Sequence, residues 1–318
     1  MPPDTSLFSD VADALGIAHP AIVEKDYYAV KLLKILSTLE IPGYTLVFAG
    51  GSCLAKVHQN TWRMSEDIDI KLVPKEKTRS LSREKRRQLR RDVHQKIIKL
   101  IQASDTFKLD GEPKKRNEGR FQQFLIQYPT HYDRFEALRP HLQLELTESP
   151  PLQNPVTSPL RSLYAEVAGQ AHEVDQFACV TMESAAAEKL VSLLRRTATV
   201  ARNRERADDP ALIRHVYDLH LIMNQEPDPE RLKDLVNQVI ETDVNQFGNQ
   251  HPEFRENPTT ELWFGFEQLK QDPIHQQRYK EFIGPLVYHP EPADWDTAFT
   301  NLKKMVEAIL GNNKSAQQ

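Results

Sequence analysis

Apolar residues recur at two different spacings along this chain, and each spacing predicts a different element. Ile22 to Leu39 carries apolar residues at helical spacing, which predicts a helix that Pro42-Gly43 ends. Tyr44 to Ala49 is a short apolar run that predicts a buried strand. Asp67 to Val73 alternates apolar with charged residues, so we predict a strand with one apolar and one polar face.

The same spacings predict a mixed N-terminal half and a helical C-terminal half. Further strands are expected at 107–109, 120–128, 141–146 and 175–182, with a basic helix at 81–101 and a proline-rich connection at 150–159. Helices are expected at 183–197, 210–223, 229–242, 260–268 and 295–310. The sequence therefore predicts an α/β (α+β) fold, a mixed sheet followed by helices, with the boundary near residues 175–183.

Composition narrows the class of protein. The 318 residues suffice for one large or two ordinary domains, and 39% of them are hydrophobic, which is enough for a core. No run of eighteen apolar residues predicts a membrane span, and the N-terminus lacks the pattern of a secretory signal. Cys53 and Cys179 are the two cysteines; they could pair, but they are too few for a disulfide framework or a zinc site. We expect a cytoplasmic protein without a membrane partner.

Positive charge is concentrated in one segment. From Lys75 to Lys99 there are eleven Lys/Arg and three Asp/Glu, a local charge of +8 in a chain of net charge −4. A second basic patch, Lys114 to Arg116 with Arg120, follows. Such asymmetry can mark a surface that binds polyanions, although a solvated helix face is an equally simple explanation.

A glycine turn followed by two aspartates carries the candidate chemistry. Gly50-Gly51-Ser52 lies between the first strand and a short helix that we expect Ser52 to cap. Alternation places Asp67 and Asp69 on one strand face, where a magnesium ion would relieve their repulsion. On the strand at 141–146, Glu145 lies opposite the leucines and is the expected third carboxylate. An exposed strand face is the alternative explanation for each acidic residue.

These residues resemble a known family. Phe48 to Ser52, followed by Arg63 to Asp69, is similar to the AbiEii/AbiGii toxins, which are polymerase-β-like nucleotidyltransferases with the MenT toxins as relatives. The family's later motifs, a lysine on one helix and an Arg-Asp pair on the next, match the segments 188–196 and 214–219. The likeness covers roughly residues 20–225. It departs at Ser52, where the family often has threonine, and at residues 58–63, which form a longer loop.

The resemblance implies a nucleotidyltransferase domain with a mixed sheet over residues 1–180 and an α-helical domain over 181–318 that completes the nucleotide site. It also implies magnesium, an NTP substrate, an RNA acceptor, with tRNA expected, and an antitoxin encoded nearby. The expected catalytic residues are Asp67, Asp69, Lys189 and Asp218, and the expected magnesium ligands are Asp67, Asp69 and Glu145. The expected nucleotide-binding residues are Gly51, Ser52, Arg63, Ser65, Lys189 and Arg214.

The two later motifs can also be examined physically. On a helical wheel Lys189 falls beside the apolar stripe, which predicts a packed stem and a free ammonium group that could grip a triphosphate. Arg214 and Asp218 lie four residues apart, on the side opposite the apolar stripe, where they can pair. A surface lysine and a surface salt bridge are the alternative explanations.

Two other functions stay open at this point. The chain could modify a protein side chain instead of RNA, or it could be a catalytically silent module that binds nucleotide or RNA. The two aspartates and Lys189 argue against the silent module, and the basic segment favours RNA.

Overall fold

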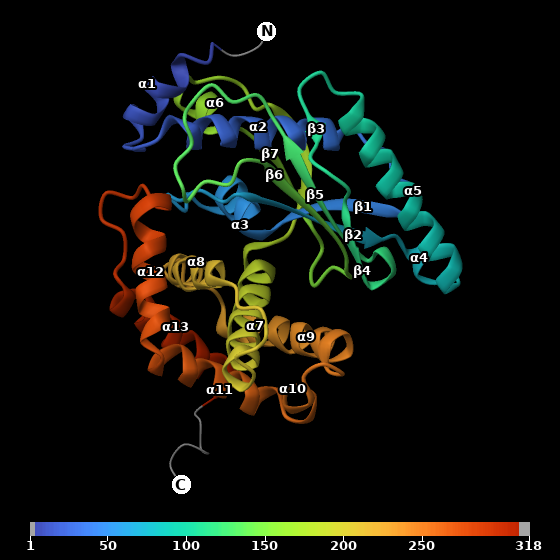
Figure 1. The fold of residues 1–318 in the computed structure, drawn as a ribbon. Coiled ribbons are helices and arrows are strands. Elements are labelled where there is room, and N and C mark those ends of the chain that lie inside the picture. Colours follow the sequence, from blue (N-terminus) through green and yellow to red (C-terminus); the bar gives the residue numbers. More distant parts are fainter. Residues whose placement is uncertain (1–3, 312–318) are drawn as a thin grey trace. The chain divides into compact units, whose positions relative to one another are not determined.

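The computed structural model describes residues 4–311 and divides the chain into two compact units (Figure 1). The first unit is Met1–Thr181 with Tyr288–Pro290, and the second is Met182–Val287 with Glu291–Gln318. No helix within the described residues has the length and hydropathy that a membrane span requires.

A mixed sheet forms the centre of the first unit. Its strand order is β3-β5-β6-β2-β1-β8-β7, with β4 also paired to β5. Neighbouring strands run parallel in the pairs β2/β6 and β1/β8 and antiparallel elsewhere. The strands are β1 (Tyr44–Ala49), β2 (Asp67–Pro74), β3 (Lys108–Leu109), β4 (Lys114–Arg116), β5 (Phe121–Gln127), β6 (Leu142–Glu148), β7 (Val156–Leu160) and β8 (Val174–Cys179).

One face of this sheet is apolar and the other is polar at its centre. Ile68 and Ile70 of β2 pair with Leu144 and Leu146 of β6, and all four are buried. Since side chains alternate along a strand, Asp67 and Asp69 lie on the opposite face from the isoleucines. The predicted alternation over residues 67–73 is thus confirmed.

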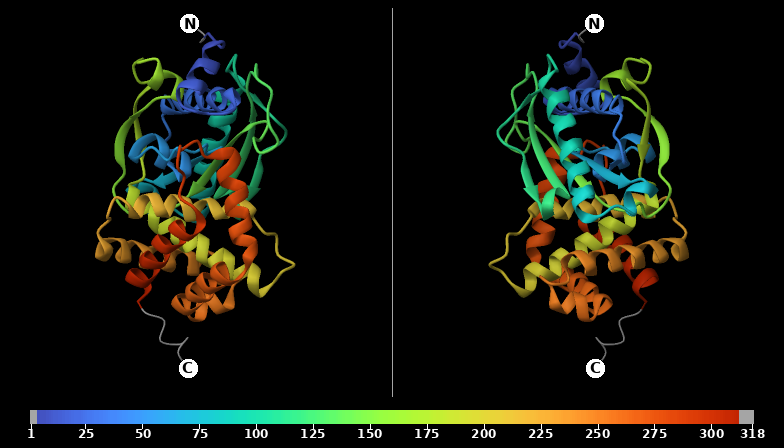
Figure 2. Two further views of the ribbon diagram at one scale, coloured as in Figure 1. Left: turned by 90° about the vertical axis from the view of Figure 1, so that its left-hand side faces the viewer. Right: turned by 90° about the vertical axis from the view of Figure 1, so that its right-hand side faces the viewer.

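Helix α2 lies across the sheet of the first unit, as Figure 1 and the two turned views in Figure 2 show. Pro20 starts this helix, where its missing N–H leaves no hydrogen bond unmade. The helices of this unit are α1 (Leu7–Ala14), α2 (Pro20–Ser37), α3 (Gly50–Cys53), α4 (Glu76–Arg79), α5 (Arg83–Gln102) and α6 (Leu163–Val167), with a π-helical turn at Leu54–His58 and a 3-10 turn at Asn117–Gly119.

Two expectations for the first unit were wrong. Residues 150–159 are not only a connection, because Val156–Leu160 pairs with β8 as an edge strand. Pro159 falls at a register shift in that strand, a position where no ladder N–H is needed. The expected strand at 175–182 ends at Cys179, because Met182 already begins the next helix.

The second unit is helical and is built around α7. This helix packs against α8, α9 and α11, and α13 packs against α8 and α9. A side chain at Gly265 of α11 would lie 2.0 Å from the Leu194 carbonyl oxygen, so only glycine allows α11 to approach α7 this closely. The helices are α7 (Met182–Arg202), α8 (Arg214–Met223), α9 (Pro229–Phe247), α10 (Pro252–Glu256), α11 (Pro258–Gln271), α12 (Pro273–Leu286) and α13 (Trp295–Leu310), with a 3-10 turn at Pro210–Ile213.

Candidate active site

The glycine turn after β1 lies directly against one of the two aspartates. Gly50 has φ +72°, a left-handed conformation that glycine adopts without strain. A Cβ atom at this position would lie 1.8 Å from Oδ2 of Asp69. Because Gly50 has no side chain, the turn leaves the space that the Asp69 carboxylate occupies. The sequence predicted that Gly50 is part of the turn, but not that it lies against Asp69.

The second glycine brings two predicted nucleotide-binding residues together. A Cβ atom on Gly51 would lie 2.5 Å from Nη2 of Arg63 and 2.8 Å from Oγ of Ser65. Arg63 is buried, and its Nη1 donates to the Met64 carbonyl oxygen at 3.0 Å. Gly51, Arg63 and Ser65 are thus neighbours, although they come from both ends of the loop between β1 and β2.

Ser52 does not cap a helix, so that expectation was wrong. Helix α3 begins at Gly50, which places Ser52 inside the helix. The Ser52 hydroxyl donates to the carbonyl oxygen of Asp67 at 2.5 Å and lies 3.3 Å from that of Ser65. This side chain ties the turn to the start of β2, and thereby to the aspartates.

The predicted carboxylates lie on one face of two parallel strands. Asp69 pairs in register with Glu145, and Asp67 pairs with Gln143. Oε1 of Glu145 accepts hydrogen bonds from the amides of Gln123 at 2.9 Å and Gln143 at 2.8 Å. Burial raises the pKa of Glu145, and the negative charge of Asp67 adds to that shift. The strand register therefore concentrates negative charge at this place.

The donors at this place fit magnesium in chemical type. Asp67, Asp69 and Glu145 supply carboxylate oxygens from one sheet face, and magnesium binds in proteins through one or two carboxylates plus substrate phosphates and water. Within residues 4–311, no three His, Cys, Asp or Glu side chains stand ready as a complete metal cluster. Asp67, Asp69 and Glu145 therefore share one sheet face without being gathered into a metal cluster, and the two aspartates on β2 remain the expected core of the site.

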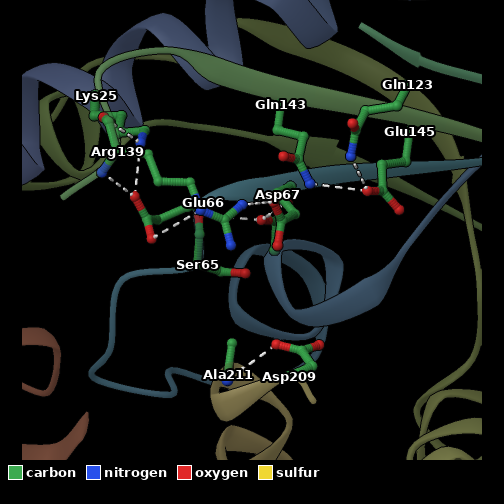
Figure 3. A network of polar contacts seen from close by, with 11 residues as sticks. Lys25, Ser65, Glu66, Asp67, Gln123, Arg139, Gln143, Glu145, Asp209 and Ala211 are labelled. Carbon is green, nitrogen blue, oxygen red and sulfur yellow. Dashed lines mark hydrogen bonds and ion pairs between the residues drawn. The ribbon is translucent and has the colours of Figure 1, made fainter. Parts of the chain in front are cut away.

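Three charged residues that sequence reasoning missed form a network that reaches Asp67 (Figure 3). Arg139 donates from Nη1 to Oδ1 of Asp67 at 2.6 Å. Buried Glu66 accepts from Nζ of Lys25 at 2.8 Å and from the backbone N–H of Arg139 at 2.7 Å. One sequence signal existed: Glu66 immediately precedes β2, and extending the alternation back by one residue puts it on the side of Ile68, where a charge needs a buried partner.

In the helical unit, Lys189 is buried and ion-paired. Its side chain is 7% exposed, and its Nζ lies 2.8 Å from Oδ2 of Asp218, which is fully buried. The expected free ammonium group was therefore wrong. The expectation that Asp218 faces away from the apolar stripe was also wrong. The guanidinium of Arg214 lies 5.8 Å from the ring centroid of Phe282.

Gly50→Ala is expected to displace Asp69 and thereby to impair the nucleotide transfer that the family resemblance implies. The left-handed backbone conformation alone costs an alanine about 1–2 kcal/mol of stability. The added methyl group must also displace the Asp69 carboxylate, which lies 1.8 Å from its position. The matched control is Gly111→Ala, because Gly111 has φ +79° and open space around it. Thermal melting should fall in both variants, and further in Gly50→Ala because of the added clash, whereas nucleotide transfer should fall only in Gly50→Ala. Equal activities would show that Gly50 does not position Asp69.

Comparison with known proteins now identifies the family. The family model described as "Nucleotidyl transferase AbiEii toxin, Type IV TA system" matches residues 34–301. Among solved structures, the chain resembles MenT4, a nucleotidyltransferase toxin from Mycobacterium tuberculosis H37Rv, with a TM-score of 0.60 and 18% identity over 98% of this chain and 91% of that one. No curated protein matches. The structural likeness confirms the predicted fold, a mixed α/β part followed by helices. Since the family match spans most of its length, this chain belongs to the AbiEii nucleotidyltransferase toxin family.

Proposed function

We propose that this protein transfers a nucleotide from an NTP to an RNA acceptor, with tRNA as the expected substrate and magnesium as the metal. The observation that carries the proposal is the placement of Asp67, Asp69 and Glu145 on one face of β2 and β6, beside the Gly50 turn. Family membership supports the nucleotidyltransferase chemistry. The RNA acceptor rests on the positive charge described below.

Each site residue receives a role from its chemistry. Asp67 and Asp69 would hold magnesium, with Glu145 as the third carboxylate. Gly51 has no side chain to obstruct a phosphate, and Ser52 fixes the turn through its bond to the Asp67 carbonyl oxygen. Arg63, with Ser65 beside it, would offset phosphate charge. Magnesium, when bound, would supply electrostatic stabilisation to a transfer in which the acceptor hydroxyl loses its proton and its oxygen bonds to the α-phosphorus as the bond to pyrophosphate breaks.

The residues of the helical unit are assigned roles because they match the family's later motifs in the same order along the chain. Lys189 would bind the triphosphate, and its ion pair with Asp218 would set the direction of its ammonium group. Arg214 is assigned to the nucleotide on the same ground. We further propose that the protein acts in the cytoplasm as the toxin of a toxin–antitoxin or phage-defence pair. An antitoxin encoded nearby would then be its protein partner.

Helix α5 carries the basic surface that favours an RNA acceptor. Arg87, Arg91 and Lys99 are exposed on this helix, and Lys114–Arg116 is exposed on β4. Arg90 is different, because it is 2% exposed and its Nη1 lies 2.7 Å from Oε2 of Glu148. Although Arg90 belongs to the basic segment, it therefore lies on the packed side of α5 and is not part of the exposed basic surface.

Replacing exposed cations of α5 is expected to cripple transfer to RNA. The variant Lys85→Gln/Arg87→Gln/Arg91→Gln removes three charges and leaves the buried Arg90 intact. Each lost phosphate contact weakens binding and reduces the dependence of affinity on salt. We expect RNA affinity of the parent to fall at least about tenfold from low to physiological salt, and to fall less in the variant. Lys233→Gln, exposed on α9, serves as a single-charge control. RNA modification at the parental rate by the triple variant would show that α5 is only a solvated face.

The acceptor class is tested directly by incubating the protein with each labelled NTP, magnesium and total cellular RNA or total cellular protein. Label recovered in RNA supports the proposal, and the size of the labelled species identifies tRNA. Label recovered only in protein would replace RNA by a protein side chain as the acceptor. No label in either fraction, with intact NTP bound, would indicate a silent binding module.

A further inference from the structure

A buried ion pair lies next to the candidate metal site. One member binds the backbone N–H and the other the backbone carbonyl oxygen of the same residue. Lys25 of α2 is 0% exposed and Glu66 is 1% exposed, and their charged atoms lie 2.8 Å apart. Burying two charges is expensive, and such a pair is weak evidence for stability. The hydrogen bonds that this pair makes to a third residue are more informative than its effect on stability.

Both members of this pair bind residue 139. Oε1 of Glu66 accepts the backbone N–H of Arg139 at 2.7 Å, and Nζ of Lys25 donates to the Arg139 carbonyl oxygen at 3.0 Å. These bonds fix a loop residue to α2 and to the start of β2 although it is 114 and 73 positions away in sequence. Both the N–H and the carbonyl oxygen of Arg139 are therefore hydrogen-bonded to buried side chains.

The side chain of Arg139 reaches Asp67, the first aspartate of β2. Nη1 of Arg139 lies 2.6 Å from Oδ1 of Asp67, and the side chain is 32% exposed. A second cation on the same carboxylate would oppose magnesium electrostatically unless an anion balances both. A triphosphate brings several negative oxygens to such a place, and a guanidinium matches phosphate geometry.

We propose that Arg139 is a phosphate-binding residue at the candidate metal site, and that the buried Lys25–Glu66 pair positions it. This inference rests on the proposed function, because it takes the NTP as the ligand. Arg139 would contact a triphosphate oxygen while its main chain stays fixed. Lys25 and Glu66 are positioning residues, because they bind the backbone of Arg139 and act through it.

The test uses the intact protein and inorganic triphosphate with Mn²⁺, which avoids the unknown base preference. Arg139→Gln should bind triphosphate at least about tenfold more weakly, as expected for loss of one charge-assisted bond. Mn²⁺ alone, followed by electron paramagnetic resonance, should bind no more weakly than to the parent. Arg139→Lys, which keeps the charge, should recover part of the affinity. Arg134→Gln, exposed in the same loop, is the matched control and should bind like the parent.

The positioning role has its own measurement. The variant Lys25→Met/Glu66→Met removes both buried charges together, with both of their bonds to the Arg139 main chain, and so avoids stranding either charge. It should weaken triphosphate binding in the parent background and add little when Arg139 is already glutamine. Such non-additivity indicates action through Arg139, whereas full additivity would overturn the positioning role.

The outcomes also separate this inference from the proposed function. Unchanged triphosphate affinity in Arg139→Gln, with Mn²⁺ binding lost in Asp67→Asn, would overturn only the role of Arg139. Mn²⁺ binding that survives in Asp67→Asn would instead remove the metal site and the proposed function with it. Weaker binding of Mn²⁺ alone in Arg139→Gln would show that Arg139 supports the metal and not the phosphate.

Discussion

Asp67→Asn and Asp69→Asn are expected to fold like the parent and to lose nucleotide transfer by at least about a hundredfold each, the loss typical of removing one electrostatic contact to a transition state. An amide keeps the shape of the carboxylate but removes the charge that holds magnesium. At position 69 the shape of the side chain matters as much as its charge, because Asp69 packs directly against the Gly50 turn. Transfer of labelled NTP into RNA and thermal melting are the two measurements.

Asp105→Asn is the matched control for these variants, since Asp105 is exposed on the same unit and far from β2 in sequence. It should retain parental activity and melting. If Asp67→Asn/Asp69→Asn still transferred nucleotide at the parental rate, the assignment of this place as the active site would be wrong.

Lys189→Ala is expected to lower the melting temperature on the order of 10 °C, in addition to any loss of activity. The substitution strands Asp218 as a fully buried charge, and breaking a buried pair from one side costs about 3–5 kcal/mol. A free ammonium group, which the helical wheel had predicted, would instead let this lysine be removed with little loss of stability. Calorimetry of Lys189→Ala beside Lys233→Ala, exposed on α9, provides the measurement.

A double variant separates the contribution of Lys189 to the stability of the protein from its contribution to nucleotide transfer. Lys189→Met/Asp218→Asn removes both charges and should regain much of the lost stability. If Lys189 also binds the triphosphate, this double variant stays inactive although it melts close to the parent. Recovered activity would show that the lysine serves the fold alone.

The sequence predicted those parts of the site whose signal is local. Strand β2 alternates through Asp67, Ile68 and Asp69, and one period of two residues decides both its type and its polar face. The same logic on β6 placed Glu145 on the polar face, and strand pairing then set it beside Asp69. These inferences needed only neighbouring residues.

The missed features depend on partners that are distant in sequence. Lys25 and Glu66 are separated by 41 positions, and no local pattern reveals that they meet. The helical wheel placed Lys189 beside an apolar stripe correctly, but it carries no information about α8, from which Asp218 approaches. Strand β7 was missed because a proline lies within it, and only the register shift against β8 shows why proline is tolerated there.

The two cysteines give the sheet unit a built-in reporter of opening. Cys53 on α3 and Cys179 on β8 are both free thiols and fully buried. Burial raises the pKa of Cys53, and neighbouring Cys179 adds to that shift, so the thiol stays protonated and inert to alkylating reagents while the fold is closed. Since the chain has no other cysteine, the rate of alkylation follows transient unfolding around the Gly50 turn and is silent about the helical unit. Faster thiol labelling of the Lys189 or Asp67 variant than of the parent would therefore show that the substitution loosens the sheet unit.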